Sequence, residues 1–308
     1  MTGRNQIKPF ANPRTNAAIL AAFVVLALPA MAAPKNRPQS WLRKGELPGK
    51  PIRTTDALPL SDQNNEGDWV RFEPMSDEFD AAALDETKWW PNNPRWLGRK
   101  PAYFWDRNVT IENGKLCLTM RKEEAPGMPR DKGYHTYTSA AVQSKTKVRY
   151  GYFEIRAKPM KSAGSSSFWF YHNTPERWTE IDVFEIGGAA PGFEKKYNMN
   201  VHVFHTPTEK DHWSAHAAWI APANLADDYH VYALEWDQDR IRWYFDGVLV
   251  RWVENTHWHQ KLTLNFDSET MPDWFGMPDD DHLPSTYRID YVRAWKRKQP
   301  NADAGLRQ

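Results

Sequence analysis

Apolar and polar residues alternate with a period of two over much of the chain between 68 and 298. This spacing is typical of β-strands that bury one face, and Asn113-Gly114 and Asp246-Gly247 are hairpin-turn signals between such runs. Sustained helical periodicity is confined to 80–90. We therefore predict a single all-β sandwich domain over 66–298. The alternation is clearest over 109–112, 116–120, 147–157, 197–204, 230–236, 240–246 and 287–295.

The first residues have the pattern of an export signal. Basic residues at 4, 8 and 14 precede an apolar run over 17–28, and the Ala-Met-Ala at 30–32 fits a small-residue cleavage site. The run is shorter than the roughly 20 residues that span a bilayer. We predict a signal peptide over 1–32, secretion to the extracellular space or periplasm, and no membrane association after its removal. An uncleaved anchor is the alternative.

Two further segments flank the predicted domain. Residues 33–65 are polar and rich in proline, with no periodic apolar pattern, so we expect a mobile linker. Residues 299–308 are expected to form a disordered tail.

The composition excludes some partners and raises the question of a groove. Forty basic and 39 acidic residues leave a net charge of +1, which gives no reason to expect binding to nucleic acid or an anionic membrane. Cys117 is the only cysteine, so it is interpreted as a core residue and no internal disulfide can form. The 16 Trp, 12 Tyr and 14 Phe fit a large β core, or partly a groove that stacks on sugar rings.

Three carboxylates interrupt an otherwise apolar strand, WTEIDVFEIGG, over 178–188. Glu180 and Asp182 share a face because they are two residues apart, whereas Glu185 would fall on the apolar face of a regular strand. A buried, unpaired carboxylate is costly. We therefore predict a β-bulge near Val183-Phe184, which returns Glu185 to the face of the other two acids.

The predicted bulge allows a pair of glutamates to act together. The Cα atoms of Glu180 and Glu185 would lie roughly 13–16 Å apart, and side chains that lean together could bring the carboxyl groups to about 5–6 Å. A retaining glycosidase needs about 5–5.5 Å, and an inverting one about 6.5–9.5 Å. Asp182 can orient Glu180 and raise the proton affinity of Glu185. A metal site or a solvated acidic edge is the alternative.

These residues resemble a known family. Glu180-Ile-Asp-Val-Phe-Glu185 is similar to the E-x-D-x-x-E signature of glycoside hydrolase family 16, whose members are retaining endo-hydrolases with a jelly-roll fold. The resemblance continues over 76–80, 84–89, 144–154 and 289–295. The segments that look most like β-agarases and the related porphyranases are 93–99, 225–232, 255–260 and 266–276.

The resemblance implies specific roles and a substrate. Glu180 would be the nucleophile, Asp182 its helper and Glu185 the acid/base, on a jelly roll of two curved antiparallel sheets with an open groove. The implied activity is endo-hydrolysis of β-1,4 linkages in a red-algal galactan, with agarose the first expectation, by a monomer that requires no cofactor. A structural calcium, held in part by Asp290, is also implied.

Several other residues are candidates for substrate binding. A loop at 93–99 bounded by Pro and Gly is a favourable place for binding groups, because loops over a rigid sheet commonly carry them. His202 shares a predicted strand face with Asn198 and Asn200, and Glu269 lies in a segment that reads as a loop. The full set is Trp96, Arg99, Trp105, Trp169, Trp178, His202 and Glu269. A structural role, in the core for the tryptophans, is the alternative for each.

The sequence also bears on three other functions: a zinc peptidase, a hydrolase of another polysaccharide, and a non-catalytic binding protein. His212 and His216 have zinc-helix spacing, but Trp213 stands where a zincin has glutamate, which argues against a zinc peptidase. Porphyran, carrageenan or laminarin are alternative substrates, and Arg95, Arg99 and Lys100 suit a sulfated one. A non-catalytic carbohydrate-binding jelly roll is the alternative from another class, although it would not need both glutamates.

Overall fold

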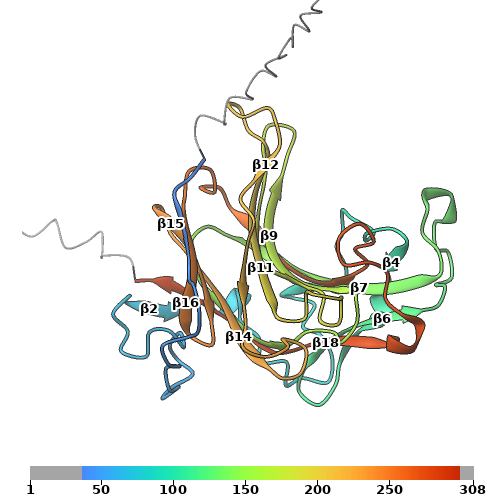
Figure 1. The fold of residues 1–308 in the computed structure, drawn as a ribbon, viewed down its shortest axis with the longest axis horizontal. Coiled ribbons are helices and arrows are strands. Elements are labelled where there is room, and N and C mark those ends of the chain that lie inside the picture. The colour runs from blue at the N-terminus through green and yellow to red at the C-terminus, as the bar shows by residue number, and fades with distance from the viewer. Residues whose placement is uncertain (1–36, 299–308) are drawn as a thin grey trace, which may run out of the picture. The chain divides into compact units, whose positions relative to one another are not determined.

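The computed structural model describes residues 37–298, and strands dominate the compact unit over 38–298 (Figure 1). Nearly all strand pairs are antiparallel and form two layers. The sheet distant from the acids, here called the outer sheet, contains in order β1 (Ser40–Leu42), β16 (Val248–Glu254), β15 (Arg240–Phe245), β14 (His230–Trp236), β8 (Gly151–Lys158), β18 (Ser285–Arg297), β6 (Leu116–Lys122) and β5 (Val109–Ile111), with β2 (Trp69–Arg71) beside β18.

The second layer, here called the cleft sheet, carries the acidic strand. Its order is β3 (Trp89–Trp90), β7 (Tyr137–Val148), β17 (Leu262–Glu269), β9 (Ser165–Asn173), β10 (Trp178–Ile186) and β11 (Lys196–His205), followed by β12 (Trp213–Ser214) and β13 (Ala217–Ile220). β4 (Ala102–Phe104) pairs with β7 in parallel. The 3-10 turns are η1 (Glu73–Met75), η2 (Asp106–Asn108), η3 (Arg130–Lys132) and η4 (Asp280–His282).

The structure confirms the all-β sandwich and its hairpins. Asn113-Gly114 joins β5 to β6, and Asp246-Gly247 joins β15 to β16, with positive φ at all four residues. A two-residue turn with two positive φ angles matches the twist of the strands that it connects. The predicted strand over 147–157 is instead two strands, β7 and β8, because the chain turns between them at Tyr150, whose φ is 62°.

The helical periodicity over 80–90 does not correspond to a helix in the structure. Asp85 accepts hydrogen bonds from the backbone N–H and the hydroxyl of Thr87, which favours a turn over a helix. Trp89 then enters β3, which pairs with β7, and its side chain is fully buried in the core. Tertiary burial therefore overrides a weak local preference for helix. Among the described residues, no helix is long and apolar enough to cross a membrane.

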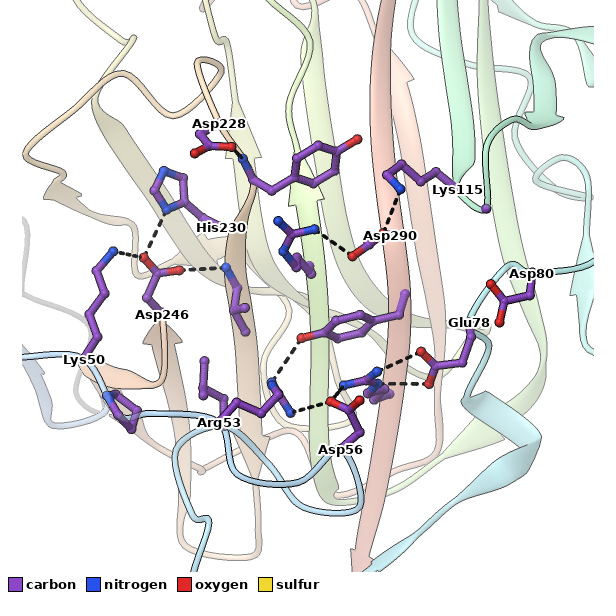
Figure 2. Close-up of a pocket in the computed structure, with 18 of the residues that line it drawn as sticks. Lys50, Arg53, Asp56, Glu78, Asp80, Lys115, Asp228, His230, Asp246 and Asp290 are labelled. Carbon is purple, nitrogen blue, oxygen red and sulfur yellow. Dashed lines mark hydrogen bonds and ion pairs between the residues drawn. The ribbon is translucent and has the colours of Figure 1, made fainter.

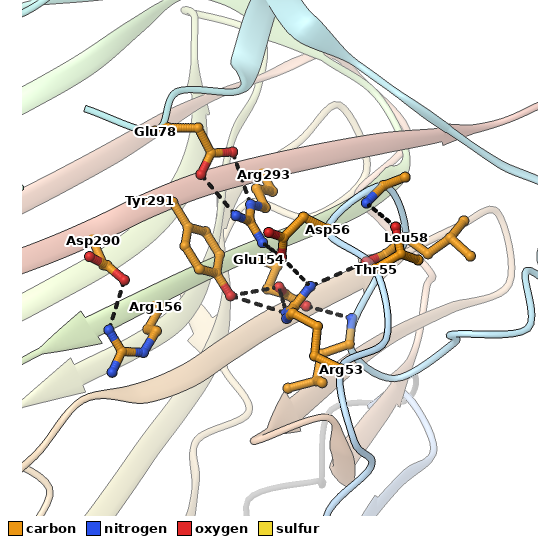
Figure 3. A network of polar contacts seen from close by, with 12 residues as sticks. Arg53, Thr55, Asp56, Leu58, Glu78, Glu154, Arg156, Asp290, Tyr291 and Arg293 are labelled. Atoms are coloured by element: carbon orange, nitrogen blue, oxygen red, sulfur yellow. Dashed lines mark hydrogen bonds and ion pairs between the residues drawn. The ribbon is translucent and has the colours of Figure 1, made fainter. Parts of the chain in front are cut away.

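The linker expected over 33–65 differs from the structure in its described part. β1 extends the outer sheet through β16, and Leu60 is buried. Arg53 forms an ion pair with the fully buried Glu154, which also accepts a hydrogen bond from the backbone N–H of Leu60 (Figure 3). A few isolated anchors hold this polar segment, so no periodic pattern reveals its packing. The predicted signal peptide over 1–32 and the tail over 299–308 lie outside the described residues.

Candidate active site

The bulge in β10 is present where the sequence predicted it. Asp182 lies opposite Trp169 of β9, but the next paired residue is Phe184, opposite Phe168, so Val183 is the extra residue. The pairing with β11 shifts between Asp182 and Glu185 as well. Both Val183 and Phe184 are fully buried in the core. The bulge therefore lets two consecutive apolar side chains enter the core while Glu185 returns to the acidic face.

Glu180, Asp182 and Glu185 line one cavity of about 490 Å³ on the cleft sheet. A second cavity of about 510 Å³ adjoins it, and Arg99, Glu180, Glu185 and Phe204 line both. The two glutamates therefore lie where the cavities meet. A groove that continues on both sides of the reacting groups suits the interior of a long polymer.

Burial and mutual repulsion control protonation in the cleft. Burial, and next the charge of Asp182, raise the pKa of Glu185 well above its usual range. The pKa of Glu180 is raised for the same reasons, with Glu185 and Glu269 adding to the effect, while Arg99 opposes it. Each ionised carboxylate disfavours ionisation of its neighbours. The cleft therefore retains a proton at a pH where free carboxyl groups have lost theirs, as an acid catalyst requires.

Side chains approach Asp182 from the cleft and the backbone of β10 from the core. His202 Nε2 lies 3.2 Å from Asp182 Oδ2, and the Asn200 amide lies 2.8 Å from the same ring nitrogen. From the core, Trp258 Nε1 donates to the main-chain oxygen of Glu180 at 2.8 Å, and Trp243 Nε1 donates to that of Asp182 at 2.9 Å. These indoles fix the backbone on either side of Ile181.

The structure brings most of the predicted binding residues to the cleft. The loop at 93–99 lies over it, and Arg99 Nε donates to Glu269 Oε2 at 2.8 Å. Trp105 was predicted to bind substrate, but its side chain packs instead against a separate cluster that contains Met128 and Tyr134. The predicted residues that line the two cavities are Trp96, Arg99, Trp169, Trp178, His202 and Glu269.

Asp267 and Trp274 are among the residues of the cleft region that the sequence did not predict. Asp267 accepts a hydrogen bond from Trp169 Nε1 at 2.5 Å, and burial followed by the charge of Glu269 raises its pKa. The segment around Asp267 and Glu269 belongs to β17 and is not a loop, so their spacing of two would have revealed a shared face. Trp274 is 36% exposed and lines the second cavity. The only sequence signal for this position is the aromatic-rich segment in which Trp274 lies.

The surroundings of Asp290 do not fit a calcium ion. Lys115 Nζ lies 3.0 Å from one carboxylate oxygen, and Arg156 donates to the other at 2.7 Å (Figures 2 and 3). Calcium requires several oxygen ligands, whereas here two cations already neutralise the carboxylate. The implied calcium role of Asp290 is therefore not supported.

Within the part of the chain that the structure describes, two other groups have ligand atoms close enough for a cation. Glu180, Asp182 and His202 have such atoms within 4.8 Å of one another, and so do the exposed Asp279, Asp281 and His282. The first group contains the acids whose arrangement a glycosidase needs, and the second is a solvated acidic turn. We assign a metal to neither.

A β-sandwich with an open cleft and paired glutamates around an aspartate has the architecture of a glycoside hydrolase. A family model described as "Beta-porphyranase A-D, GH16 domain" matches residues 69–297. The chain therefore belongs to this group within glycoside hydrolase family 16, and its sandwich is the family's jelly roll.

Individual relatives agree with this assignment. Beta-porphyranase E of Zobellia galactanivorans is 31% identical over 253 residues, which cover 74% of this chain and 88% of that protein. The crystal structure of porphyranase B from the same organism superposes with a TM-score of 0.65 at 28% identity, covering 74% of this chain and 92% of that one. Beta-agarase A of Zobellia galactanivorans has a TM-score of 0.63 at 21% identity, with 74% and 92% covered, and shows the shared fold alone.

Replacing the exposed Trp274 by alanine is expected to weaken polysaccharide binding. Stacking on an aromatic face is worth about 0.5–1.5 kcal/mol, so KM should rise by about 2–13-fold with little change in kcat. Steady-state kinetics on the preferred polysaccharide measure this effect. Trp90→Ala is the matched control, because Trp90 is similarly exposed but is not among the residues that line either cavity. An unchanged KM for Trp274→Ala would contradict the assignment.

Proposed function

We propose that this protein is an endo-acting, retaining β-1,4-galactan hydrolase whose preferred substrate is porphyran, a sulfated red-algal galactan. It acts as a secreted monomer without a cofactor. The family match and the porphyranase relatives favour porphyran over the agarose that the sequence first suggested. The observation in the cleft that carries the proposal is a pair of arginines near the catalytic glutamates.

Arg95 and Arg99 line the cavity that contains Glu180 and Glu185. The Arg99 side chain is 49% exposed even though its Nε is engaged by Glu269, which leaves guanidinium donors for a ligand. Planar guanidinium groups bind tetrahedral oxyanions through two parallel hydrogen bonds. Arg99 already offsets the acids of the cleft through Glu269, whereas the only polar contact of the Arg95 guanidinium within the described residues is a main-chain oxygen. A sulfated sugar would supply the anion that Arg95 lacks.

The proposed reaction is a double displacement. Glu185, whose pKa is raised by burial and by Asp182, donates its proton to the glycosidic oxygen while ionised Glu180 attacks the anomeric carbon. The leaving chain departs with that proton, and a glycosyl ester forms on Glu180. Glu185, now a carboxylate, deprotonates a water molecule that cleaves the ester, so the product keeps the β configuration. Asp182 orients Glu180 between these steps.

A panel of porphyran, agarose, κ-carrageenan and laminarin tests the substrate. We expect reducing ends to appear fastest on porphyran, and ¹H NMR to show β-anomeric ends before mutarotation. Fastest release from agarose would establish the second candidate, a β-agarase, since the segments 93–99 and 266–276 resemble β-agarases as well as porphyranases. Initial release of α-anomeric ends would exclude the retaining mechanism.

Arg95→Ala is expected to reduce selectivity for the sulfated polymer. Its guanidinium makes one weak contact with the protein, a hydrogen bond of 3.5 Å to the main-chain oxygen of Asn173, so the fold should tolerate the change. Loss of a charged hydrogen bond costs about 1.5–3 kcal/mol, so kcat/KM on porphyran should fall by at least about tenfold. The value on agarose, which lacks sulfate, is the internal control. An equal loss on both polymers would mean that Arg95 does not read the sulfate.

Residues 1–32 are proposed to direct export, since a long polysaccharide is degraded outside the cytoplasm. Expression of the full chain in a bacterial host, followed by mass spectrometry of the exported protein, should find an N-terminus close to residue 33. A protein that keeps residues 1–32 in the cell membrane would instead be anchored.

A further inference from the structure

Arg251 is a buried cation that the proposed mechanism does not use. It lies on β16 of the outer sheet, is 2% exposed, and ranks among the largest fully buried side chains. Within residues 38–298, no carboxylate lies within 4 Å of its guanidinium. Burying a charge without an adjacent counter-charge is expensive, so its surroundings must offset the cost.

The contacts of Arg251 lead to the acidic strand. Its guanidinium donates to the main-chain oxygens of Met199 on β11 and Ala215, which follows β12. The guanidinium carbon also lies 4.6 Å from the ring centroid of Trp243. The same Trp243 donates through Nε1 to the main-chain oxygen of Asp182 at 2.9 Å. The cation therefore lies beneath the strands that present Asp182 to the cleft.

The other side of these strands carries an excess of acid. Carboxyl groups of β10 and β17 repel one another there, while Arg99 is the cation that reduces their proton affinity from within the cleft. Asp182 in turn is the main group that favours the charged form of Arg251, and the pKa of Arg251, lowered by burial to about 9, keeps it charged at neutral pH. The five acids are Glu180, Asp182, Glu185, Asp267 and Glu269.

We propose that Arg251 is the buried counter-charge of the cleft carboxylates, a positioning residue that acts from inside the sandwich and stabilises negative charge on Asp182 and on the neighbouring nucleophile. The proposal rests on the proposed function in that Glu180 acts as the nucleophile. A fixed positive charge in a medium of low polarity is effective over a longer range than one in water. It costs no space in the groove, which remains free for the polymer.

Other charged groups face the same acids and must be held constant in any test. Arg99 approaches from the loop over the cleft, and His202 from β11. His216 lies between β12 and β13, and burial followed by the charge of Arg251 lowers its pKa. Tyr197, buried on β11, also faces Arg251, and its pKa is raised by burial. None of these residues is altered in the variants below.

A purely structural role is the competing explanation. Ala215 lies between β12 and β13, where the ladder to β11 is interrupted, and Arg251 satisfies its carbonyl group. In that case Arg251 would serve as a hydrogen-bond donor and its charge would not matter. Lysine keeps the charge but loses the fork of donors, and glutamine keeps an N–H donor but loses the charge.

The experiment compares Arg251→Lys with Arg251→Gln through the pH profile of kcat/KM. The acidic limb reports ionisation of the nucleophile in the free enzyme. We expect the acidic limb of the Arg251→Gln profile to lie at higher pH than that of the unaltered protein, by on the order of one pH unit. This is the shift in pKa that removal of one charge about 10 Å away produces at an effective dielectric constant of about 20. The limb of Arg251→Lys should stay near that of the unaltered protein. An unmoved limb in Arg251→Gln, or an equal shift in both variants, would overturn the proposal.

Folding is measured alongside, by thermal unfolding at pH 7, and needs no substrate. Asp182→Asn should lower Tm more in the Arg251 background than in the Arg251→Gln background, because only the first contains the pair of opposite charges. Equal losses in both backgrounds would overturn the proposal.

Arg251→Met, which removes both the charge and the donors, is compared as well. If neither Arg251→Gln nor Arg251→Met folds, a folded Arg251→Lys supports the role of the charge, whereas an unfolded Arg251→Lys overturns the proposal in favour of the structural role. A chain that cleaves none of the polysaccharides would refute the proposed function and leave this comparison valid.

Discussion

Glu180→Gln and Glu185→Gln are each expected to reduce kcat by a factor on the order of 10³ or more, with the fold intact. Glutamine preserves the shape of the side chain but can neither attack the anomeric carbon nor donate a carboxylic proton. Both residues line the same cavity. Each has a different task there, one as nucleophile and one as acid/base, so neither can replace the other. Because both carboxyl groups are buried among other acids, loss of one charge relieves repulsion, so Tm should be unchanged or higher.

The measurement is the rate of reducing-end release, with binding to the insoluble polymer followed in parallel. Glu176→Gln, on the exposed turn between β9 and β10, is the matched control and should retain full activity. Exogenous azide distinguishes the two roles in the corresponding alanine variants, Glu180→Ala and Glu185→Ala, where the shortened side chain leaves room for the anion. It should restore turnover with an inverted, α-glycosyl azide product in the variant that lacks the nucleophile, and with a β-glycosyl azide product in the variant that lacks the acid/base. Near-normal activity in either glutamine variant would refute the catalytic assignment.

Deleting residues 38–62 is expected to destabilise the sandwich strongly, although the segment precedes the region that matches the family. The deletion removes Arg53 and the backbone N–H of Leu60, both of which bind the buried Glu154, and leaves the hydroxyl of Tyr291 as its remaining partner (Figure 3). Leaving a buried charge unpaired costs about 3–5 kcal/mol. At about 2–4 °C for each kcal/mol, Tm should fall by about 6–20 °C.

The matched control for this deletion is Glu154→Gln in the shortened chain. It removes the unpaired charge and should recover a large part of the lost Tm, whereas the same substitution in the full chain should lower Tm, because it breaks the pair with Arg53. Thermal unfolding followed by circular dichroism measures all four proteins. A shortened chain with the original Tm would mean that residues 38–62 contribute no net stability, despite their contacts.

The sequence alone predicts the acidic face of β10, because that face depends on the spacing of residues within one strand. Glu180 and Asp182 share a face by the period of the strand, and the extra residue before Glu185 predicts a bulge that the register with β9 confirms. The hairpins at Asn113-Gly114 and Asp246-Gly247 were predictable for a similar reason, since a tight turn depends on its own residues. Local geometry thus determined the sandwich, its turns and the acidic face.

Only the tertiary structure decided which distant groups meet that face. Arg251 is about seventy residues from Asp182 in the chain, yet the packing of the two sheets places it beneath the acidic strand. The same packing sends Trp105 to another cluster and pairs Asp290 with Lys115 and Arg156 in place of an ion. Such contacts depend on strand order and on the approach of the sheets, which no local period encodes. A sequence pattern therefore determines which face a side chain takes, while the fold determines what that face meets.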